Sequence, residues 1–164
     1  MKSDHERPVA IKAAVLTVSS TRIEENDTSG KEIMTLLGKA GIKVGNYAII
    51  PDNIEAIQRE VLDSIKSCNC VILNGGTGLT HDDCTIEAVS PLLEKKIDGF
   101  GELFRAKSVN EVGTAAMLSR AIAGVCHEKV VFCIPGSTPA ATLATRELII
   151  PELRHIISHA MKRS

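Results

Sequence analysis

The sequence has few aromatic side chains and no excess of charge. Its 164 residues include no tryptophan, one tyrosine and three phenylalanines, so it lacks the aromatic platforms on which proteins stack single-stranded bases. Nineteen basic and twenty acidic residues give a formal net charge of −1, which provides no overall field to attract nucleic acid or a membrane surface. We therefore expect neither as a partner, and an anionic ligand would need local donors.

A disulfide framework, a zinc motif and a long apolar run are also missing. The five cysteines are odd in number and contain no Cys-x-x-Cys pair, and we interpret Cys68 and Cys70 as a loop and a strand cysteine rather than metal ligands. The first residues have mixed charge and no apolar h-region, which predicts a flexible tail over residues 1–9 and no signal peptide. These features favour a cytoplasmic protein with a single domain over residues 10–164.

That domain shows strands alternating with helices. Short apolar runs predict strands at residues 10–18, 42–50, 70–73 and 129–134. Apolar spacing predicts longer helices at 29–40 and 54–65, helices beginning at Pro139 and Pro151, and short helices at 85–89, 91–95, 100–107 and 114–123. Such alternation indicates a parallel sheet covered on both faces, so we expect an α/β three-layer sandwich with a mostly parallel central sheet.

The first of these helices has a start and a stop signal. Ser29 and Glu32 have the spacing of a capping box, which predicts Ser29 as the N-cap. Residues 33, 36, 37 and 40 would form the buried face of this helix. Gly41 stands where a C-terminal cap belongs.

Each predicted strand ends in a polar or glycine-bearing loop. The four loops are Ser19-Ser20-Thr21, Asp52-Asn53, Gly75-Gly76-Thr77-Gly78 and Gly136-Ser137-Thr138. Because the carboxyl ends of parallel strands lie at one edge of a sheet, we expect these loops to surround a single crevice.

The loop at residues 75–78 carries the strongest local signal. Its three glycines let the backbone approach a ligand and turn its N–H groups toward an anion, although a tight turn required only by the fold would also explain them. No Walker Gly-Lys-Ser/Thr follows, and His81 stands where a dinucleotide fingerprint needs its third glycine. An NAD- or flavin-dependent oxidoreductase is therefore a weaker alternative.

Two acidic positions lie next to the predicted crevice. Asp52 follows the second strand, while Asp82 and Asp83 follow the glycine loop. Asp82 and Asp83 could serve only as an acidic helix N-terminus, and Asp52 only as part of a turn. Beside an anion-binding loop, however, such carboxylates suit Mg²⁺, which binds one or two of them together with phosphate oxygens. The combination suggests Mg-nucleotide chemistry.

Motifs spread over nearly the whole chain resemble the molybdopterin adenylyltransferase family, the MoaB/MogA-type proteins of molybdenum cofactor synthesis. The matching segments are residues 17–22 (TVSSTR), 27–30 (DTSG), 50–52 (IPD), 75–80 (GGTGLT), 99–102 (GFGE), 118–121 (LSRA) and 135–137 (PGS). Residues 79–80 and 99–105 look closer to the MoaB branch. The resemblance implies an α/β sandwich that assembles as a homotrimer or as a hexamer.

The resemblance also implies a reaction, the Mg-ATP-dependent adenylylation of molybdopterin with release of pyrophosphate. It implies Asp52 and Asp83 as catalytic, Mg²⁺-binding acids. To contacts with the nucleotide or the pterin we assign Ser19, Ser20, Gly75, Gly76, Thr77, Gly78, Gly136, Ser137 and Arg120. Further candidates are Arg22 and Arg105 as charge partners, with weaker cases for Glu102 and Ser119.

The segment His81-Asp82 departs from the family pattern. Many relatives have a basic or neutral residue before the acid that corresponds to Asp83, whereas this chain adds a second negative charge there. This difference leaves open a second class of function, a non-catalytic trimer that binds molybdopterin or a nucleotide.

Overall fold

Six strands form one sheet in the order β2-β1-β3-β6-β5-β4 in the computed structural model, which describes residues 9–162. The tail expected at residues 1–9 lies outside the described residues except for Val9. The strands are β1 (Lys12–Val18), β2 (Lys43–Ile50), β3 (Cys70–Asn74), β4 (Lys95–Lys96), β5 (Ile122–Cys126) and β6 (Lys129–Ile134). The first four in the sheet order pair in parallel, whereas β5 is antiparallel to both β6 and β4.

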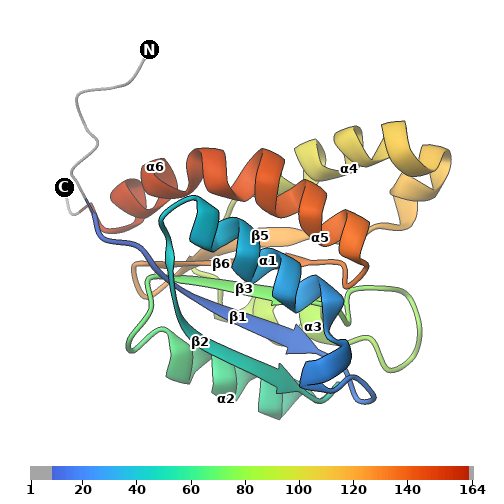
Figure 1. Cartoon of the computed structure of the whole chain (residues 1–164), viewed down its shortest axis with the longest axis horizontal. Helices are drawn as coiled ribbons and strands as arrows, with labels where there is room; N and C mark the ends of the chain where they lie inside the picture. The colour runs from blue at the N-terminus through green and yellow to red at the C-terminus, as the bar shows by residue number, and fades with distance from the viewer. Residues whose placement is uncertain (1–8, 163–164) are drawn as a thin grey trace.

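Helices cover both faces of this sheet (Figure 1). One face carries α1 (Thr28–Lys39), α4 (Asp98–Val112), α5 (Thr138–Ala144) and α6 (Ile150–Ala160), and the other carries α2 (Ile54–Ser64) and α3 (Thr85–Val89). The expected three-layer sandwich with a mostly parallel sheet is thereby confirmed. No helix within residues 9–162 has both the length and the apolar character needed to cross a membrane.

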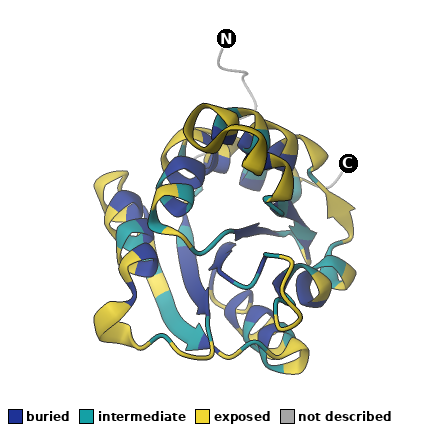
Figure 2. Ribbon diagram, turned by 90° about the vertical axis from the view of Figure 1, so that its right-hand side faces the viewer, coloured by how far each residue is buried: buried dark blue, intermediate teal, exposed yellow. Residues whose placement is uncertain are grey.

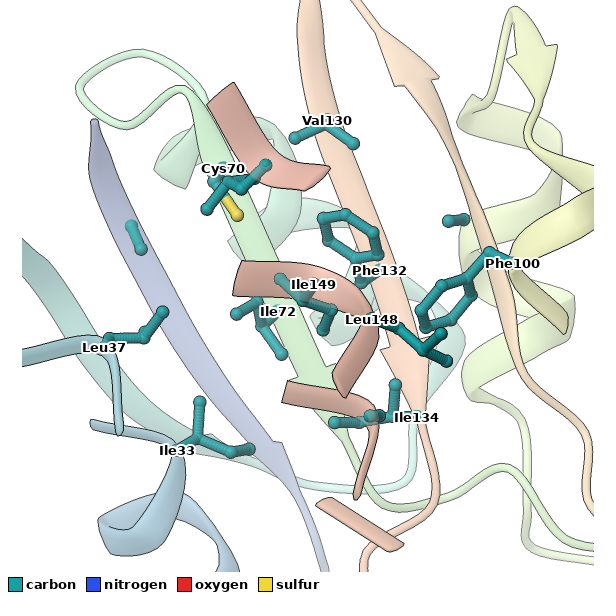
Figure 3. Packing of buried hydrophobic residues seen from close by; sticks show 14 of the residues in the cluster. Ile33, Leu37, Cys70, Ile72, Phe100, Val130, Phe132, Ile134, Leu148 and Ile149 are labelled. Carbon is teal, nitrogen blue, oxygen red and sulfur yellow. The ribbon is translucent and has the colours of Figure 1, made fainter. Parts of the chain in front are cut away.

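The core divides into two layers because strand side chains alternate between the faces of the sheet. Ile72 and Phe132 point to the face covered by α1, α5 and α6, where they pack with Ile33 and Ile149 (Figure 3). Leu73, next to Ile72 on β3, belongs to the layer under α2 and α3. Burying a side chain of this size contributes about 1.5–3 kcal/mol, so both helical layers are held firmly to the sheet.

The start of α1 differs from the prediction. Its N-cap is Asp27, whose carboxylate accepts the N–H of Gly30, and not Ser29. Ser29 cannot serve as the cap because its hydroxyl is buried and donates to Asn74 on β3. Ala40, expected on the buried face, is exposed, since the helix ends at Lys39. Gly41 follows with a φ of +76°, as its predicted capping position requires.

The predicted helices at residues 91–95 and 114–123 are also wrong. Residues 90–92 and 113–118 form only short 3-10 helices, and the segments that follow them become the strands β4 and β5. A two-residue turn joins β5 to β6, and both of its residues, His127 and Glu128, have positive φ. Hairpin turns of this kind normally carry Asn-Gly or Asp-Gly, so His-Glu gave no recognisable signal in the sequence.

A π-helix at Thr145–Ile149 joins α5 to α6 without a loop. The helices predicted to begin at Pro139 and Pro151 are both present, but they form one continuous helical segment along the sheet rather than two separate helices (Figure 1). Pro139 and Pro151 lie in the first turns of α5 and α6, where the missing proline N–H costs least.

Candidate functional site

The carboxyl ends of the parallel strands open into a cavity of about 560 Å³, which we call the strand-end cavity. Figure 2 looks at this end of the molecule, where exposed loops surround the ends of buried strands. The cavity is lined by residues 18–22, Asp52, residues 75–78, Asp82, Asp83, residues 118–120, Pro135 and Gly136. Of the residues assigned to catalysis or ligand binding, this lining includes all except Ser137, and of the further candidates it includes Arg22 and Ser119 but neither Arg105 nor Glu102.

The backbone conformation of the glycine loop at residues 75–78 leaves no room for a side chain at Gly75. Gly75 has a φ of +98°, and a Cβ there would overlap the carbonyl oxygen of Val18. Thr85, at the start of α3, holds the loop in place: its hydroxyl donates to the carbonyl of Gly75 at 2.8 Å, and its N–H donates to the carbonyl of Gly76 at 3.0 Å. The N–H of Gly75 is already bonded to Ile134. Within residues 9–162 the N–H groups of residues 76–78 have no such acceptor, so these are the donors left for an anion.

The side chain of Arg120 is hydrogen-bonded to this loop. Its Nε donates to the carbonyl of Thr77 at 2.8 Å, and its Nη2 to that of Gly78 at 2.9 Å. Nη1 and Nη2 also donate to the two carboxylate oxygens of Glu87, and this hydrogen bonding keeps the pKa of Glu87 below its usual value. The predicted contact between Arg120 and a ligand would therefore be made by a guanidinium whose orientation is already fixed.

Asp52 and Asp83 each have one oxygen bonded and one without a bond. Oδ2 of Asp52 accepts the hydroxyl of Ser20 at 2.8 Å, and Oδ2 of Asp83 accepts the hydroxyl of Thr80 at 2.8 Å. No hydrogen bond formed within residues 9–162 involves either Oδ1 atom. Among these residues no group of three or more histidine, cysteine or acidic side chains forms a complete metal cage. A cation here would therefore need oxygen ligands from a substrate as well.

The cavity has a slight excess of negative charge. Three carboxylates, those of Asp52, Asp82 and Asp83, stand against the two guanidinium groups of Arg22 and Arg120. The neighbouring thiol of Cys84 responds to this field, since burial and then the charge of Asp52 raise its pKa. An anionic ligand would meet repulsion from these carboxylates unless a cation came with it.

The most extensive polar network of the site was missed in the sequence. Asp27 is fully buried, and its Oδ2 accepts the hydroxyls of Thr17 and Tyr47 while its Oδ1 accepts Gly30 N–H and Arg22 Nη1. Burial would raise the pKa of Asp27, but these hydrogen bonds outweigh it and the pKa lies below its usual value. Asn74 closes the network by donating to Thr17.

A signal for this network was present in the segment Asp27-Thr28-Ser29-Gly30. Glycine at the third position of a helix is unfavourable unless space demands it. Here a Cβ on Gly30 would overlap Oδ2 of Asp27 and come within 2.8 Å of the hydroxyl oxygen of Thr17. The glycine therefore marks the close approach of a helix to a buried carboxylate.

The remaining candidates have local structural roles. The hydroxyl of Ser19 accepts the N–H of Arg22 and shapes the loop after β1, while that of Ser137 caps α5 by accepting Ala140 N–H. Arg105 donates to the carbonyl of Ser119 and faces a different hollow, beside α4. Glu102 is exposed on α4, although Ser119 does line the strand-end cavity.

A mostly parallel sheet covered by helices on both faces, with loops gathered around the carboxyl ends of its strands, defines the class of open α/β sandwich proteins. Residues 14–155 match the model of one family of this class, described as a probable molybdopterin binding domain, and the chain belongs to this family.

Similar proteins agree with this assignment over almost their whole lengths. The molybdenum cofactor biosynthesis protein B of Bacillus cereus is 48% identical over 159 residues, which are 94% of each chain. Its namesake from Bacillus subtilis is 45% identical over 160 residues, or 96% of this chain and 94% of that one.

Solved structures agree as well. A crystal structure of a molybdenum cofactor biosynthesis protein B superposes with a TM-score of 0.91 at 48% identity, covering 96% of this chain and 99% of that one. The tungsten cofactor synthesizing protein MoaB of Pyrococcus furiosus gives a TM-score of 0.87 at 40% identity, covering 95% and 100%. A structure of MogA, at 23% identity and a TM-score of 0.81 over 91% and 99% of the two chains, supports the fold alone.

Proposed function

We propose that this chain acts in molybdenum cofactor biosynthesis, where it transfers an adenylyl group from Mg-ATP to molybdopterin. The observation that carries the proposal is the strand-end cavity. There the backbone N–H groups of residues 76–78, which have no acceptor within residues 9–162, lie in the same opening as Asp52 and Asp83, each of which accepts hydrogen bonds through only one carboxylate oxygen in that range. Membership of the molybdopterin-binding family supplies the pterin as a ligand. The glycine loop and the carboxylates supply what a polyphosphate chain needs.

The donor set at the cavity fits Mg²⁺. This ion prefers carboxylate and phosphate oxygens and usually takes only one or two ligands from the protein. The Oδ1 atoms of Asp52 and Asp83 have the required chemistry and are bonded to no other described group. When bound, Mg²⁺ would neutralise phosphate charge and so offset the negative lining of the cavity.

The reaction needs positioning rather than a general base. A terminal phosphate oxygen of molybdopterin forms a bond to the α-phosphorus of ATP, and the bond from that phosphorus to the pyrophosphate oxygen breaks. Pyrophosphate leaves with the electron pair, and no proton has to be removed because the attacking oxygen is already anionic at neutral pH. The N–H groups of residues 76–78 would hold phosphate oxygens in line for this displacement.

An assay with the purified full-length chain tests this proposal. Molybdopterin, ATP and Mg²⁺ are incubated with the protein, and adenylyl-molybdopterin and pyrophosphate are both quantified. Equal amounts of the two products are expected, and only when all three components are present. If molybdopterin binds saturably but no product forms, the adenylylation proposal is wrong.

That second outcome would favour the alternative, a pterin- or nucleotide-binding protein without catalysis. The observation on its side is Asp82, whose exposed carboxylate lines the cavity and adds a negative charge beside Asp83. This charge opposes the binding of a polyphosphate more than that of a pterin with a single phosphate. Product formation in the same assay would eliminate the alternative.

We also propose that copies of this chain associate, as a homotrimer or a hexamer. The helix α4 and the 3-10 helix after it expose large apolar side chains, namely Leu103, Val109, Val112, Met117 and Leu118. Leu118 also lines the strand-end cavity, which would bring the subunit contact close to the ligand. Sedimentation equilibrium is expected to give three or six chain masses, and a single chain mass would contradict this proposal.

The cytoplasm is the compartment we propose. All five cysteines are free thiols, and four of them are buried. Such unpaired thiols are typical of proteins kept in a reducing environment.

A further inference from the structure

We propose that Asp27 is a positioning residue whose buried carboxylate fixes Arg22 as a donor to phosphate oxygens in the strand-end cavity. This inference rests on the proposed function, because it assigns a role to two residues of the same site. The role complements that of Asp52 and Asp83, since guanidinium N–H groups attract the phosphate oxygens that those carboxylates repel.

The contacts of the Arg22 guanidinium are confined to one of its three nitrogen atoms. Nη1 donates to Oδ1 of Asp27 at 3.1 Å and to the hydroxyl of Ser29 at 2.7 Å. A guanidinium has five N–H donors, so Nε and Nη2 keep three between them. No hydrogen bond from these two nitrogens is formed within residues 9–162, and the side chain lines the cavity while 29% exposed. Arg22 therefore has one anchored end and one end available to a ligand.

Asp27 can anchor Arg22 because it is itself held from several directions. Thr17 on β1 and Tyr47 on β2 donate to its Oδ2, and the N–H of Gly30 at the start of α1 donates to its Oδ1. The carboxylate has no exposed surface, and its pKa is lowered, so it stays ionised at neutral pH. Contacts from β1, β2 and α1 thus fix the position of the Asp27 carboxylate that pairs with Arg22.

The backbone restrains Arg22 as well. Its N–H donates to the hydroxyl of Ser19 at 2.9 Å, which closes the loop after β1 and sets the direction from which the side chain leaves. Because Asp27 cancels the charge of Arg22, the pair offers a ligand directed donors rather than net positive charge. This role differs from that of Arg120, whose Nε and Nη2 are already bonded to the glycine loop.

A double-mutant cycle distinguishes positioning from a purely structural role. Affinities for Mg-ATP and for molybdopterin are measured separately by calorimetry on the full chain and on Arg22→Lys, Asp27→Asn and the double variant. A lysine keeps the charge but not the planar donors, so Arg22→Lys is expected to weaken binding of at least one ligand about 10-fold. Asp27→Asn should weaken binding of the same ligand to a similar extent. In the Arg22→Lys background it should add less than about 2-fold, since the group that Asp27 positions is gone.

The control is Arg59→Lys, an exposed arginine of α2 outside the cavity lining, which should leave both affinities unchanged. If Asp27→Asn fails to fold, as judged by thermal unfolding, Tyr47→Phe replaces it in the cycle. This variant removes one donor from Asp27. It is expected to weaken binding about 3-fold when Arg22 is present and to have no effect in the Arg22→Lys background.

Losses that multiply in the double variant, or affinities that none of the variants changes, would overturn the inference. The proposed adenylylation can fail independently of it. Coupled losses of affinity without product formation would leave the positioning role standing and refute the reaction. Product formation together with multiplying losses would support the reaction and refute the role of Asp27.

Discussion

Two groups of carboxylates around the strand-end cavity are held in very different ways. Asp27 has no exposed surface, and both of its oxygens accept hydrogen bonds from groups on β1, β2 and α1. Asp52 and Asp83 lie at the cavity surface, and within residues 9–162 only the Oδ2 of each accepts hydrogen bonds. Asp52 accepts the hydroxyl of Ser20, and Asp83 accepts the hydroxyl and the N–H of Thr80 in its own loop.

This difference suggests that Asp27 has a structural role in the site, whereas Asp52 and Asp83 are available to bind a ligand. A carboxylate with every acceptor position filled cannot take a ligand, but it can determine the position of its donors. A carboxylate with a free oxygen contributes little to the fold and remains available to a cation. Changes to Asp27 should therefore affect stability, whereas changes to Asp52 and Asp83 should affect turnover.

The largest effect is expected for Asp27→Asn. The substitution leaves Arg22 without its buried counter-charge and turns two acceptor positions into an amide, so the free energy of unfolding should fall by about 3 kcal/mol. Urea unfolding at pH 7 measures this loss. A fall of less than about 1 kcal/mol would remove the distinction between the two groups of acids.

The same variant has a pH signature. Because the pKa of Asp27 is lowered in the folded state, its contribution to stability is present above the pKa of the unfolded chain, about 3.9, and is lost as the pH falls through the folded-state pKa. The wild type should therefore lose more stability than Asp27→Asn when both are taken from pH 7 to pH 2. Parallel pH profiles would contradict this.

The next largest effect is expected for Asp52→Asn and Asp83→Asn. Each replaces a free carboxylate oxygen with a weaker ligand for Mg²⁺, so turnover in the proposed adenylylation should fall about 100-fold. Unfolding free energies should stay within about 0.5 kcal/mol of the wild type. Glu55→Gln, an exposed carboxylate on α2 that is absent from the cavity lining, is the matched control and should change neither quantity beyond these limits.

A smaller effect is expected for Tyr47→Phe, which removes one donor from Asp27 and leaves the carboxylate in place. Loss of a single hydrogen bond to a charged group should lower the free energy of unfolding by about 1.5 kcal/mol, roughly half the effect of Asp27→Asn. Urea unfolding of the two variants side by side tests this order. An effect equal to that of Asp27→Asn would mean that Tyr47 and not the carboxylate organises the network.

The smallest effect is expected for Asp82→Asn. Its carboxylate is exposed at the cavity, so removing its charge should raise the affinity for Mg-ATP about 2-fold at low ionic strength, with little change at high salt because screening already weakens the repulsion. Titration at two salt concentrations measures this. A loss of affinity would place Asp82 among the cation ligands.

Much of the cavity could be predicted from the sequence because its parts lie in continuous segments. Gly75, Asp52 and Ser20 each follow a strand whose apolar run is easy to recognise, and parallel pairing then brings the strand ends together. The network around Asp27 could not be found this way. Its members Thr17, Tyr47 and Asn74 lie on three strands, and only the register brings them together: it pairs Thr17 with Asn74 and places Tyr47 opposite Val15, two residues before Thr17.

The antiparallel end of the sheet was missed for a local reason. The segment Ile122–Cys126 contains alanine and glycine, which have little strand preference, and follows residues with helical spacing. Its pairing with β6 on one side and with β4 on the other makes it a strand. A contact of this kind overrides local propensity and leaves no trace in the segment itself.

The π-helix between α5 and α6 determines where this part of the chain can lose a residue. In the π-helix at Thr145–Ile149 the backbone accommodates an extra residue, and an ordinary helix turns by about 100° per residue. Deleting one codon within this segment would return it to an ordinary α-helix and leave Leu153 and Ile157 facing the core. A deletion between Ile150 and Ile157 would instead rotate the residues after it by that angle, so single-residue deletions in descendants of this sequence should be tolerated at residues 145–149 and avoided at 150–157.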